Sequence, residues 1–254
     1  MNIKEIKESF MRVRETQDPL FSLYKDDKRK GVQNIIKQTQ GRIARQQKAE
    51  NDFEKRFEIE TNFWSQGINL IAGIDEVGRG PLAGPVVAAA VILPHDFKIL
   101  EVNDSKKLTD QKRRELVEII KEQAISYAYA VIDNHVIDEV NIYQATRIAM
   151  KQAVESLDVK PQQLLIDAMD IDLDIPQLKI IKGDAKSNSI AAASILAKVT
   201  RDDLMIKYHK QYPEYDFCNN DGYGTPKHLA ALETYGVTPI HRKTFAPVKD
   251  LTQK

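Results

Sequence analysis

The sequence predicts an α/β fold, with a mixed sheet flanked by helices and a small helical N-terminal extension. After Gly67, short apolar segments typical of strands alternate with longer segments of helical spacing. The first two strand-like segments follow each other almost directly, whereas helices separate the later ones, so the sheet should be antiparallel first and parallel later. Residues 1–65 instead are rich in Lys, Arg, Glu and Gln and hold few glycines, which favours helices.

The extension begins with a helical pattern. Ile3, Ile6, Phe10 and Val13 recur at helical spacing, and Asp18-Pro19 breaks the pattern. Residues 28–59 then predict one or two further helices. Residues 25–48 form a basic arm, in which Asp26 and Asp27 are the acidic residues. Its cationic residues are Lys25, Lys28, Arg29, Lys30, Lys37, Arg42, Arg45 and Lys48. A solvated helix face and a grip on nucleic acid explain this arm about equally well.

Trp64-Ser65-Gln66-Gly67 marks the junction, so we expect an extension over 1–66 and a main domain over 67–254. The last predicted helix has clear end signals, with Thr225 as N-cap, Pro226 at its first position and Gly236 beyond its end. Strands are predicted at 69–75, 85–93, 125–132, 163–167 and 178–182, and helices at 110–123, 134–156, 187–211 and 225–235.

Composition limits the class of protein. Of 254 residues, 42% are hydrophobic and 29% are charged, as in a soluble globular protein. The N-terminus lacks the apolar core of a signal peptide, and no apolar run is long enough to span a bilayer. The single cysteine, Cys218, excludes an internal disulfide framework and a cysteine-rich zinc site. We therefore expect a cytoplasmic protein, with no membrane partner and acting as a monomer.

Three predicted strands end in carboxylates. Asp75 and Glu76 follow the first apolar strand, Asp167 ends Leu164–Asp167, and Asp184 follows the last strand. Any one of them alone is as readily explained by a helix cap or a solvated turn. The threefold repetition favours convergence on one edge of the sheet, where sites of α/β folds form. Such hard oxygen ligands suit Mg²⁺ or Mn²⁺, and two such ions can clamp the attacking and leaving oxygens of a phosphodiester.

Residues suited to phosphates and sugars accompany these acids. The Gly78-Arg79-Gly80 loop would let backbone approach a phosphate, although it is equally typical of an ordinary turn. Tyr223, flanked by glycines, either stacks on a sugar or base or packs on the domain surface. In the helix after Asp184 we expect Lys198 and Arg201 to be salt-bridged. Three further candidates for phosphate contact, each also explained by capping or solvation, are Lys106, Lys186 and Ser187.

Long motifs in this order resemble those of bacterial ribonuclease HII, a type 2 ribonuclease H. The resemblance spans residues 68–249, and a chance match to all of the motifs is very improbable. The motifs are GIDEVGRGPLAGPVVAAAV from Gly73, DSKKL from Asp104, LLIDA around Asp167, KGDAKSNSIAAASILAKVTRD from Lys182, GYGTPKH from Gly222 and PIHRKTFAPV from Pro239.

The resemblance implies a ribonuclease H-like fold and an endonuclease that cuts the RNA strand of RNA–DNA hybrids. It also implies nicking 5′ to single ribonucleotides in duplex DNA, leaving 5′-phosphate and 3′-hydroxyl ends, as in ribonucleotide excision during DNA replication and repair. By the same resemblance, Asp75, Glu76, Asp167 and Asp184 bind divalent metal and catalyse. Gly78-Arg79-Gly80 reads the 2′-hydroxyl at the RNA–DNA junction, and Tyr223 lies near the following deoxyribose.

Three alternatives remain at this stage. Ribonuclease HIII resembles the same domain but lacks the arginine loop, so Arg79 favours HII. A nucleic-acid-binding protein that has lost catalysis would have no reason to keep four repelling carboxylates near phosphate. A metal nuclease that acts on DNA junctions would not depend on a 2′-hydroxyl.

Overall fold

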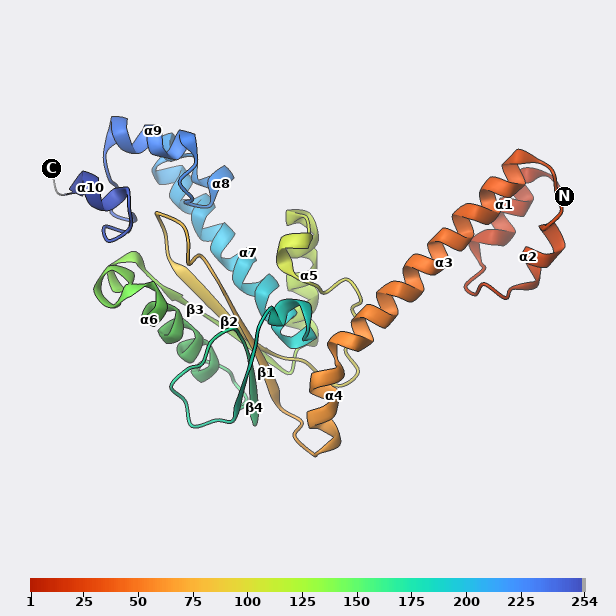
Figure 1. Ribbon diagram of the computed structural model, residues 1–254, viewed down its shortest axis with the longest axis horizontal. Helices are drawn as coiled ribbons and strands as arrows, with labels where there is room; N and C mark the ends of the chain where they lie inside the picture. The colour runs from red at the N-terminus through yellow and green to blue at the C-terminus, as the bar shows by residue number, and fades with distance from the viewer. Residues whose placement is uncertain (253–254) are drawn as a thin grey trace. The chain divides into compact units, whose positions relative to one another are not determined.

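The computed structural model describes residues 1–252. Contacts divide the chain into two compact units, Met1–Lys55 and the part from Arg56 onward. The first unit is built from helices, as predicted (Figure 1). They are α1 (Ile3–Met11), α2 (Pro19–Tyr24) and α3 (Lys30–Arg56).

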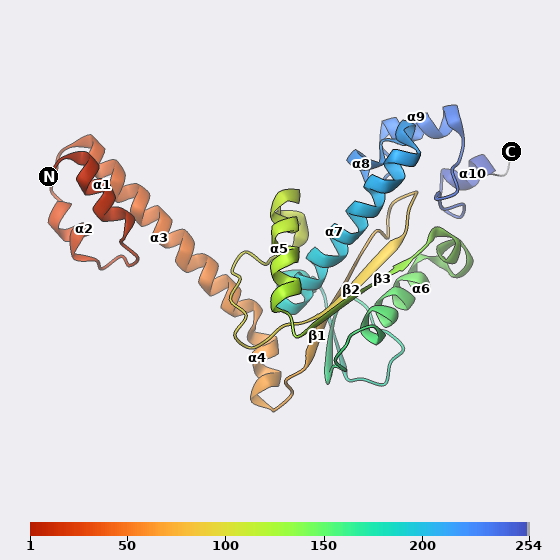
Figure 2. The ribbon, with the colours of Figure 1, turned by 180° about the vertical axis from the view of Figure 1, so that it is seen from behind.

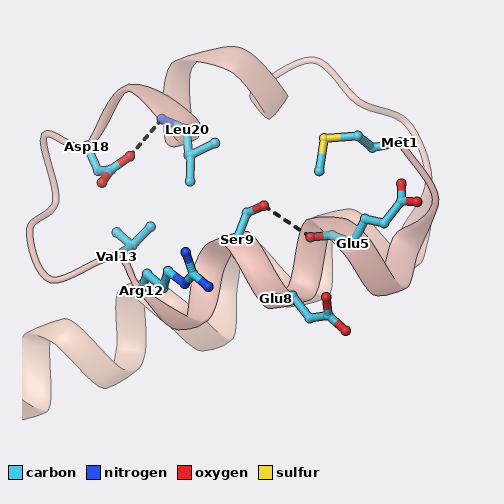
Figure 3. Close-up of a pocket in the computed structure, with 8 residues that line it drawn as sticks. All are labelled: Met1, Glu5, Glu8, Ser9, Arg12, Val13, Asp18 and Leu20. Atoms are coloured by element: carbon cyan, nitrogen blue, oxygen red, sulfur yellow. Dashed lines mark hydrogen bonds between the residues drawn. The ribbon is translucent and has the colours of Figure 1, made fainter.

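The first unit has an apolar core of its own. Ile6, Phe10 and Val13 are buried there against α3, while Ile3 is 44% exposed. A hollow of about 530 Å³ opens on this unit. Figure 3 shows its lining, where Ser9 donates to the Glu5 carbonyl and the Leu20 N–H donates to Asp18. The hollow is lined by Met1, Glu5, Glu8, Ser9, Arg12, Val13, Asp18 and Leu20.

The second unit is built on a five-stranded sheet of order β3-β2-β1-β4-β5. β1 and β2 are antiparallel, as are β2 and β3, whereas β4 and β5 run parallel to β1. The predicted change from antiparallel to parallel pairing is thus confirmed. The strands are β1 (Ile71–Val77), β2 (Val86–Ile92), β3 (Ser126–Ile132), β4 (Gln163–Asp167) and β5 (Gln177–Ile180).

Helices cover both faces of this sheet (Figures 1 and 2). α6 buries the face that carries Ala72 and Ile74, and α7 lies on the opposite face with Ile71. The long helices are α5 (Asp110–Gln123), α6 (Asn134–Glu155), α7 (Asn188–Gln211) and α9 (Pro226–Tyr235). The shorter elements are α4 (Glu58–Ser65), α8 (Phe217–Asn220), α10 (Val248–Thr252), η1 (Ser105–Lys107), η2 (Gly183–Ala185) and η3 (Pro213–Tyr215).

The four predicted helices agree closely with α5, α6, α7 and α9. One difference lies within α6, which is broken at Asn141, where φ is 69°. Helical spacing does not reveal such a break because residues on both sides of it remain buried. Within residues 1–252, no helix is both long and apolar enough to cross a membrane.

α4 belongs to the second unit by its contacts. Ile59, Phe63 and Trp64 pack with Ile71 of β1 and Ile190 of α7. The contact-based division falls between Lys55 and Arg56, whereas the boundary predicted from the sequence pattern falls between residues 66 and 67. The predicted boundary stays a prediction.

Gly73 allows α7 to approach the sheet closely. A Cβ atom at this position of β1 would lie 2.1 Å from the carbonyl carbon of Ser189. Only glycine therefore lets the backbone at the start of α7 lie directly against β1. This contact brings the segment that precedes α7, which contains Asp184, close to the end of β1.

Candidate active site

Strand register brings Asp75 and Asp167 together. β1 and β4 are adjacent and parallel, and Ile74 pairs with Ile166. The next residue of each strand is a carboxylate, so both side chains lie at the same edge of the sheet. Asp75 is 5% exposed and accepts a hydrogen bond from the Glu76 N–H at 2.8 Å. Asp167 accepts one from the Gly183 N–H, also at 2.8 Å.

Glu76 and Asp184 complete the cluster. Asp167 acts electrostatically on both of them and on Asp75, which places it among the other three acids. Glu76 forms an ion pair with Arg79 at 3.4 Å. Asp184 lies in η2, which begins after Lys182 in the left-handed conformation. All four carboxylates predicted from the strand ends therefore come together in the structure.

The cluster disfavours ionisation of Asp75 and Glu76. Burial, repulsion from Glu76 and repulsion from Asp167 raise the pKa of Asp75 well above its usual range, although a hydrogen bond with Ser194 opposes them. Burial also raises the pKa of Glu76 against the opposing charge of Arg79. A site that raises the pKa of neighbouring carboxyls is suited to a cation, because a cation offsets the repulsion.

Asp104, just before η1, and Lys106, within η1, bring a negative and a positive charge close to Asp184. Burial, and then the negative charge of Asp104, raise the pKa of Asp184, while Lys106 lowers it. Lys106 is exposed. Asp104 accepts a hydrogen bond from the Lys106 N–H at 2.9 Å and lies 3.8 Å from the Lys107 ammonium. The DSKKL motif therefore reaches the acid cluster, with Lys106 exposed beside Asp184.

Two fully buried arginines hold the glycine loop after β1. Arg242 donates to the carbonyls of Gly78, Arg79 and Gly84. Arg201 donates to the carbonyls of Pro85, Ala83 and Asp221. Burial lowers the pKa of both, and that of Arg242 falls to about 9. Because the buried guanidinium of Arg242 binds the carbonyls of Gly78 and Arg79, these carbonyls point into the protein. The Arg79 side chain nevertheless remains 43% exposed.

Tyr223 lies against this loop. A Cβ atom on Gly80 would be 3.2 Å from the Tyr223 ring, and Tyr223 is 50% exposed. Its carbonyl is 2.9 Å from His228 Nδ1, and His228 Nε2 is 2.9 Å from His241 Nε2. His241 Nδ1 accepts from the Thr238 N–H, so the chain of bonds requires His241 to donate to His228 and His228 to donate to Tyr223. The buried pair thereby fixes the backbone beneath the exposed tyrosine.

Comparison with known proteins identifies the family. The model for "Ribonuclease HII" matches residues 72–248, and that for "Ribonuclease HII N-terminal domain" matches residues 2–64. This chain belongs to the ribonuclease HII family. Ribonucleases HII cleave the RNA of RNA–DNA hybrids, so the chain is a nuclease and a hydrolase that acts on nucleic acid. The resemblance inferred from the motifs is confirmed.

Relatives match along the whole chain. It is 55% identical to the ribonuclease HII of Ligilactobacillus salivarius, over 100% of this chain and 99% of the relative. It is 56% identical to that of Lactobacillus delbrueckii subsp. bulgaricus, over 99% and 97%. Among solved structures, ribonuclease H2 from Pyrococcus horikoshii OT3 is similar with a TM-score of 0.64 and 28% identity, covering 72% of this chain and 97% of that one. The predicted ribonuclease H-like fold is thus confirmed.

The structure of this ribonuclease HII corrects two expectations. Ser187, predicted to bind substrate, is fully buried, donates to Glu60 at 2.7 Å and caps the Ile190 N–H. Its hydroxyl is thus used inside the protein. Among residues 1–252, Arg201 donates to backbone carbonyls and forms no ion pair, contrary to the expected salt bridge, whereas Lys198 does pair with Asp202 and Asp221, at 2.6 Å each. Lys186 is exposed after η2, as a phosphate contact requires.

Without metal, the repelling carboxyls of this ribonuclease HII should make its stability fall as pH rises. A carboxyl whose pKa is raised by folding stabilises the folded state below its unfolded pKa, and this contribution is lost as pH rises through the folded pKa. Asp75, with a reference pKa of 3.8, should contribute most. We expect the Tm in EDTA to decline from about pH 4 upward, and to decline less steeply in Asp75→Asn, which cannot ionise. Equal slopes for the two proteins would contradict this expectation.

Proposed function

We propose that this ribonuclease HII nicks 5′ to single ribonucleotides in duplex DNA, as well as cutting the RNA strand of hybrids. Hydrolysis would depend on Mg²⁺ or Mn²⁺ and leave 5′-phosphate and 3′-hydroxyl ends. The observation that supports this best is the position of four clustered carboxyls, Asp75, Glu76, Asp167 and Asp184, directly beside the Gly78–Gly80 loop. We propose that the enzyme acts as a cytoplasmic monomer.

The four carboxyls fit a divalent cation. Glu76 Oε2 is buried and has no hydrogen-bond partner among the described residues, which leaves a hard oxygen free to coordinate. The other donors are also carboxylate oxygens, the ligands that Mg²⁺ and Mn²⁺ prefer. When bound, such ions activate water and stabilise a departing oxygen.

The protein's own groups account for substrate choice. Backbone groups of the Gly78–Gly80 loop are proposed to read the 2′-hydroxyl, because Arg242 holds the carbonyls of Gly78 and Arg79 from the interior. The Tyr223 ring, resting against Gly80, would stack on the following deoxyribose. Lys106 and Lys186 would contact phosphates as point charges. None of these groups needs a base edge, so cleavage should be nearly independent of sequence.

The proposal predicts a specific nicking pattern. A DNA duplex with one internal ribonucleotide, an all-DNA duplex and a long RNA–DNA hybrid are each incubated with Mg²⁺ or Mn²⁺. We expect a nick 5′ to the ribonucleotide and none in the all-DNA duplex. Arg79→Ala should lower kcat/KM at the single ribonucleotide by about 10-fold or more, since we propose that the exposed Arg79 guanidinium contacts the substrate backbone, with a smaller change on the hybrid.

Arg114→Ala is the matched control, because Arg114 is a surface arginine that pairs with Asp110 and Asp203. It should leave both activities unchanged. Cutting of the long hybrid alone would indicate an enzyme like ribonuclease HIII and leave the Arg79 loop without a role. Cutting of neither substrate would favour a protein that only binds nucleic acid. A base preference at the cut site would contradict recognition through the 2′-hydroxyl.

A further inference from the structure

A buried glutamate of α4 caps the helix that follows the Asp184 segment. Glu60 is fully buried, and its Oε1 accepts hydrogen bonds from the Ser187 hydroxyl at 2.7 Å and the Ser189 N–H at 3.1 Å. The Ser187 hydroxyl in turn accepts from the Ile190 N–H at 3.1 Å. Figures 1 and 2 both place α4 next to the start of α7. Glu60 thus satisfies the Ser189 amide of α7 from another helix and holds Ser187, which caps the Ile190 amide.

Arg56 makes a second bridge from the same region. Its Nε donates to Asn188 Oδ1 at 3.0 Å, and its second terminal nitrogen donates to the Val102 carbonyl at 2.9 Å. Asn188 is the first residue of α7, and Val102 lies just before η1. Arg56 is 7% exposed, so these are contacts made in the interior. They tie α7 and the η1 segment to one guanidinium.

Both anchored segments lead directly to the acid cluster. The turn from Asp184 to Ser187 is closed by hydrogen bonds from the N–H groups of Lys186 and Ser187 to the Gly183 carbonyl, at 2.9 and 2.8 Å. The position of Ser187 therefore limits where Asp184 can lie. Val102, which Arg56 binds, is followed closely in the chain by Asp104 and Lys106, whose charges act on Asp184.

We propose that Glu60 and Arg56 are positioning residues for the Asp184 side of the active site, so that catalysis depends on residues ahead of the 72–248 region that matches the catalytic family model. The inference rests on the proposed function, because it takes Asp184 to be a metal ligand. Glu60 and Arg56 touch neither substrate nor metal in this proposal. They act by fixing the start of α7 and the η1 segment.

The test compares Glu60→Ala and Glu60→Gln in the full-length protein. Loss of the carboxyl frees Ser187 and Ser189, so we expect Glu60→Ala to lower kcat about 10–100-fold, as other supporting partners of metal ligands do. The KM for the ribonucleotide-containing duplex should change little. Mn²⁺ binding without substrate, followed by electron paramagnetic resonance, should weaken. Glu60→Gln keeps an acceptor oxygen and should behave much more like wild type.

Glu58→Ala is the matched control, since Glu58 is an exposed carboxylate in the same turn of α4. If Glu60→Ala does not fold, Arg56→Lys gives the same test, because it keeps the charge but loses the forked donor. A variant that unfolds at lower temperature yet keeps wild-type kcat and Mn²⁺ affinity while folded would overturn the inference. An inactive wild-type protein would contradict the proposed function itself, a result distinct from an active wild type with unaffected variants.

Discussion

Replacing Asp167 with Asn is expected to lower the single-turnover cleavage rate by at least about 10³-fold. The charge of Asp167 acts on all three other acids. Its loss therefore disturbs the whole proposed cation site. The fold should persist, because the amide oxygen of Asn can still accept from the Gly183 N–H. Without metal, the variant should be at least as stable as wild type, since one of the repelling charges is gone.

The matched control is Asp172→Asn. Asp172 follows β4 in the same loop, is 94% exposed and contacts only Lys151, at 3.7 Å, among the ion pairs of the described residues. This substitution should leave the cleavage rate unchanged. Rates are measured with enzyme in excess and at saturating Mn²⁺, and folding is followed by thermal unfolding. An Asp167→Asn enzyme that stays active under these conditions would remove Asp167 from the mechanism.

Replacing Arg242 with Met should destabilise the protein by roughly 3 kcal/mol or more. Three carbonyls would lose their donors, two of them buried (Gly78 and Gly84) and one part-buried (Arg79). Methionine carries no charge, so the variant no longer pays the desolvation penalty of the buried guanidinium, which offsets part of this cost. The Tm should fall by at least about 6 °C. At a temperature where the variant is folded, nicking at a single ribonucleotide should still be impaired, because the loop is no longer fixed.

Arg147→Met serves as the control for this substitution. Arg147 is a surface arginine that donates to the Asp170 carbonyl at 3.0 Å, so its loss should cost less than about 1 kcal/mol. Stability is measured by urea unfolding and nicking on the duplex with one ribonucleotide. If Arg242→Met unfolds like wild type, the buried guanidinium does not hold the loop.

Much of the site follows from local sequence. Apolar strands that end in Asp75, Asp167 and Asp184 predict a common edge, because parallel neighbours must present their ends together. The cluster also depends on the pairing of β1 with β4 and of β4 with β5, and on the close approach of α7 to Gly73, which brings in Asp184. The strand and helix limits also follow from local patterns, such as the Thr225 cap with Pro226 after it.

Other features depend on contacts between distant parts of the chain. The sequence predicts a salt bridge for Arg201 and gives no signal for Arg242, and only the fold brings backbone carbonyls to both. Ser187 has the composition of a phosphate contact, but the approach of α4 buries it. Asp104 was visible within its motif, yet its closeness to Asp184 depends on how η1 folds back.

Glu60 did carry a signal in the sequence. It lies three residues after Phe57 and four before Trp64, so it falls on the apolar stripe of a helix. A carboxylate on such a stripe is rarely buried without a partner. The composition of residues 1–65, rich in Lys, Arg, Glu and Gln, does not distinguish this position from its neighbours.

Strand β1 is completed long before its parallel neighbour exists. β2 and β3 follow β1 in the chain, and β4 begins only at Gln163, so one edge of β1 stays open during synthesis of the residues between. At about 5–20 residues per second, that interval lasts roughly 4–17 s. An open apolar edge invites pairing with other nascent chains, and charges on it oppose such pairing. Asp75 and Glu76 therefore place two acidic side chains near the end of β1, where charge opposes pairing with another nascent chain.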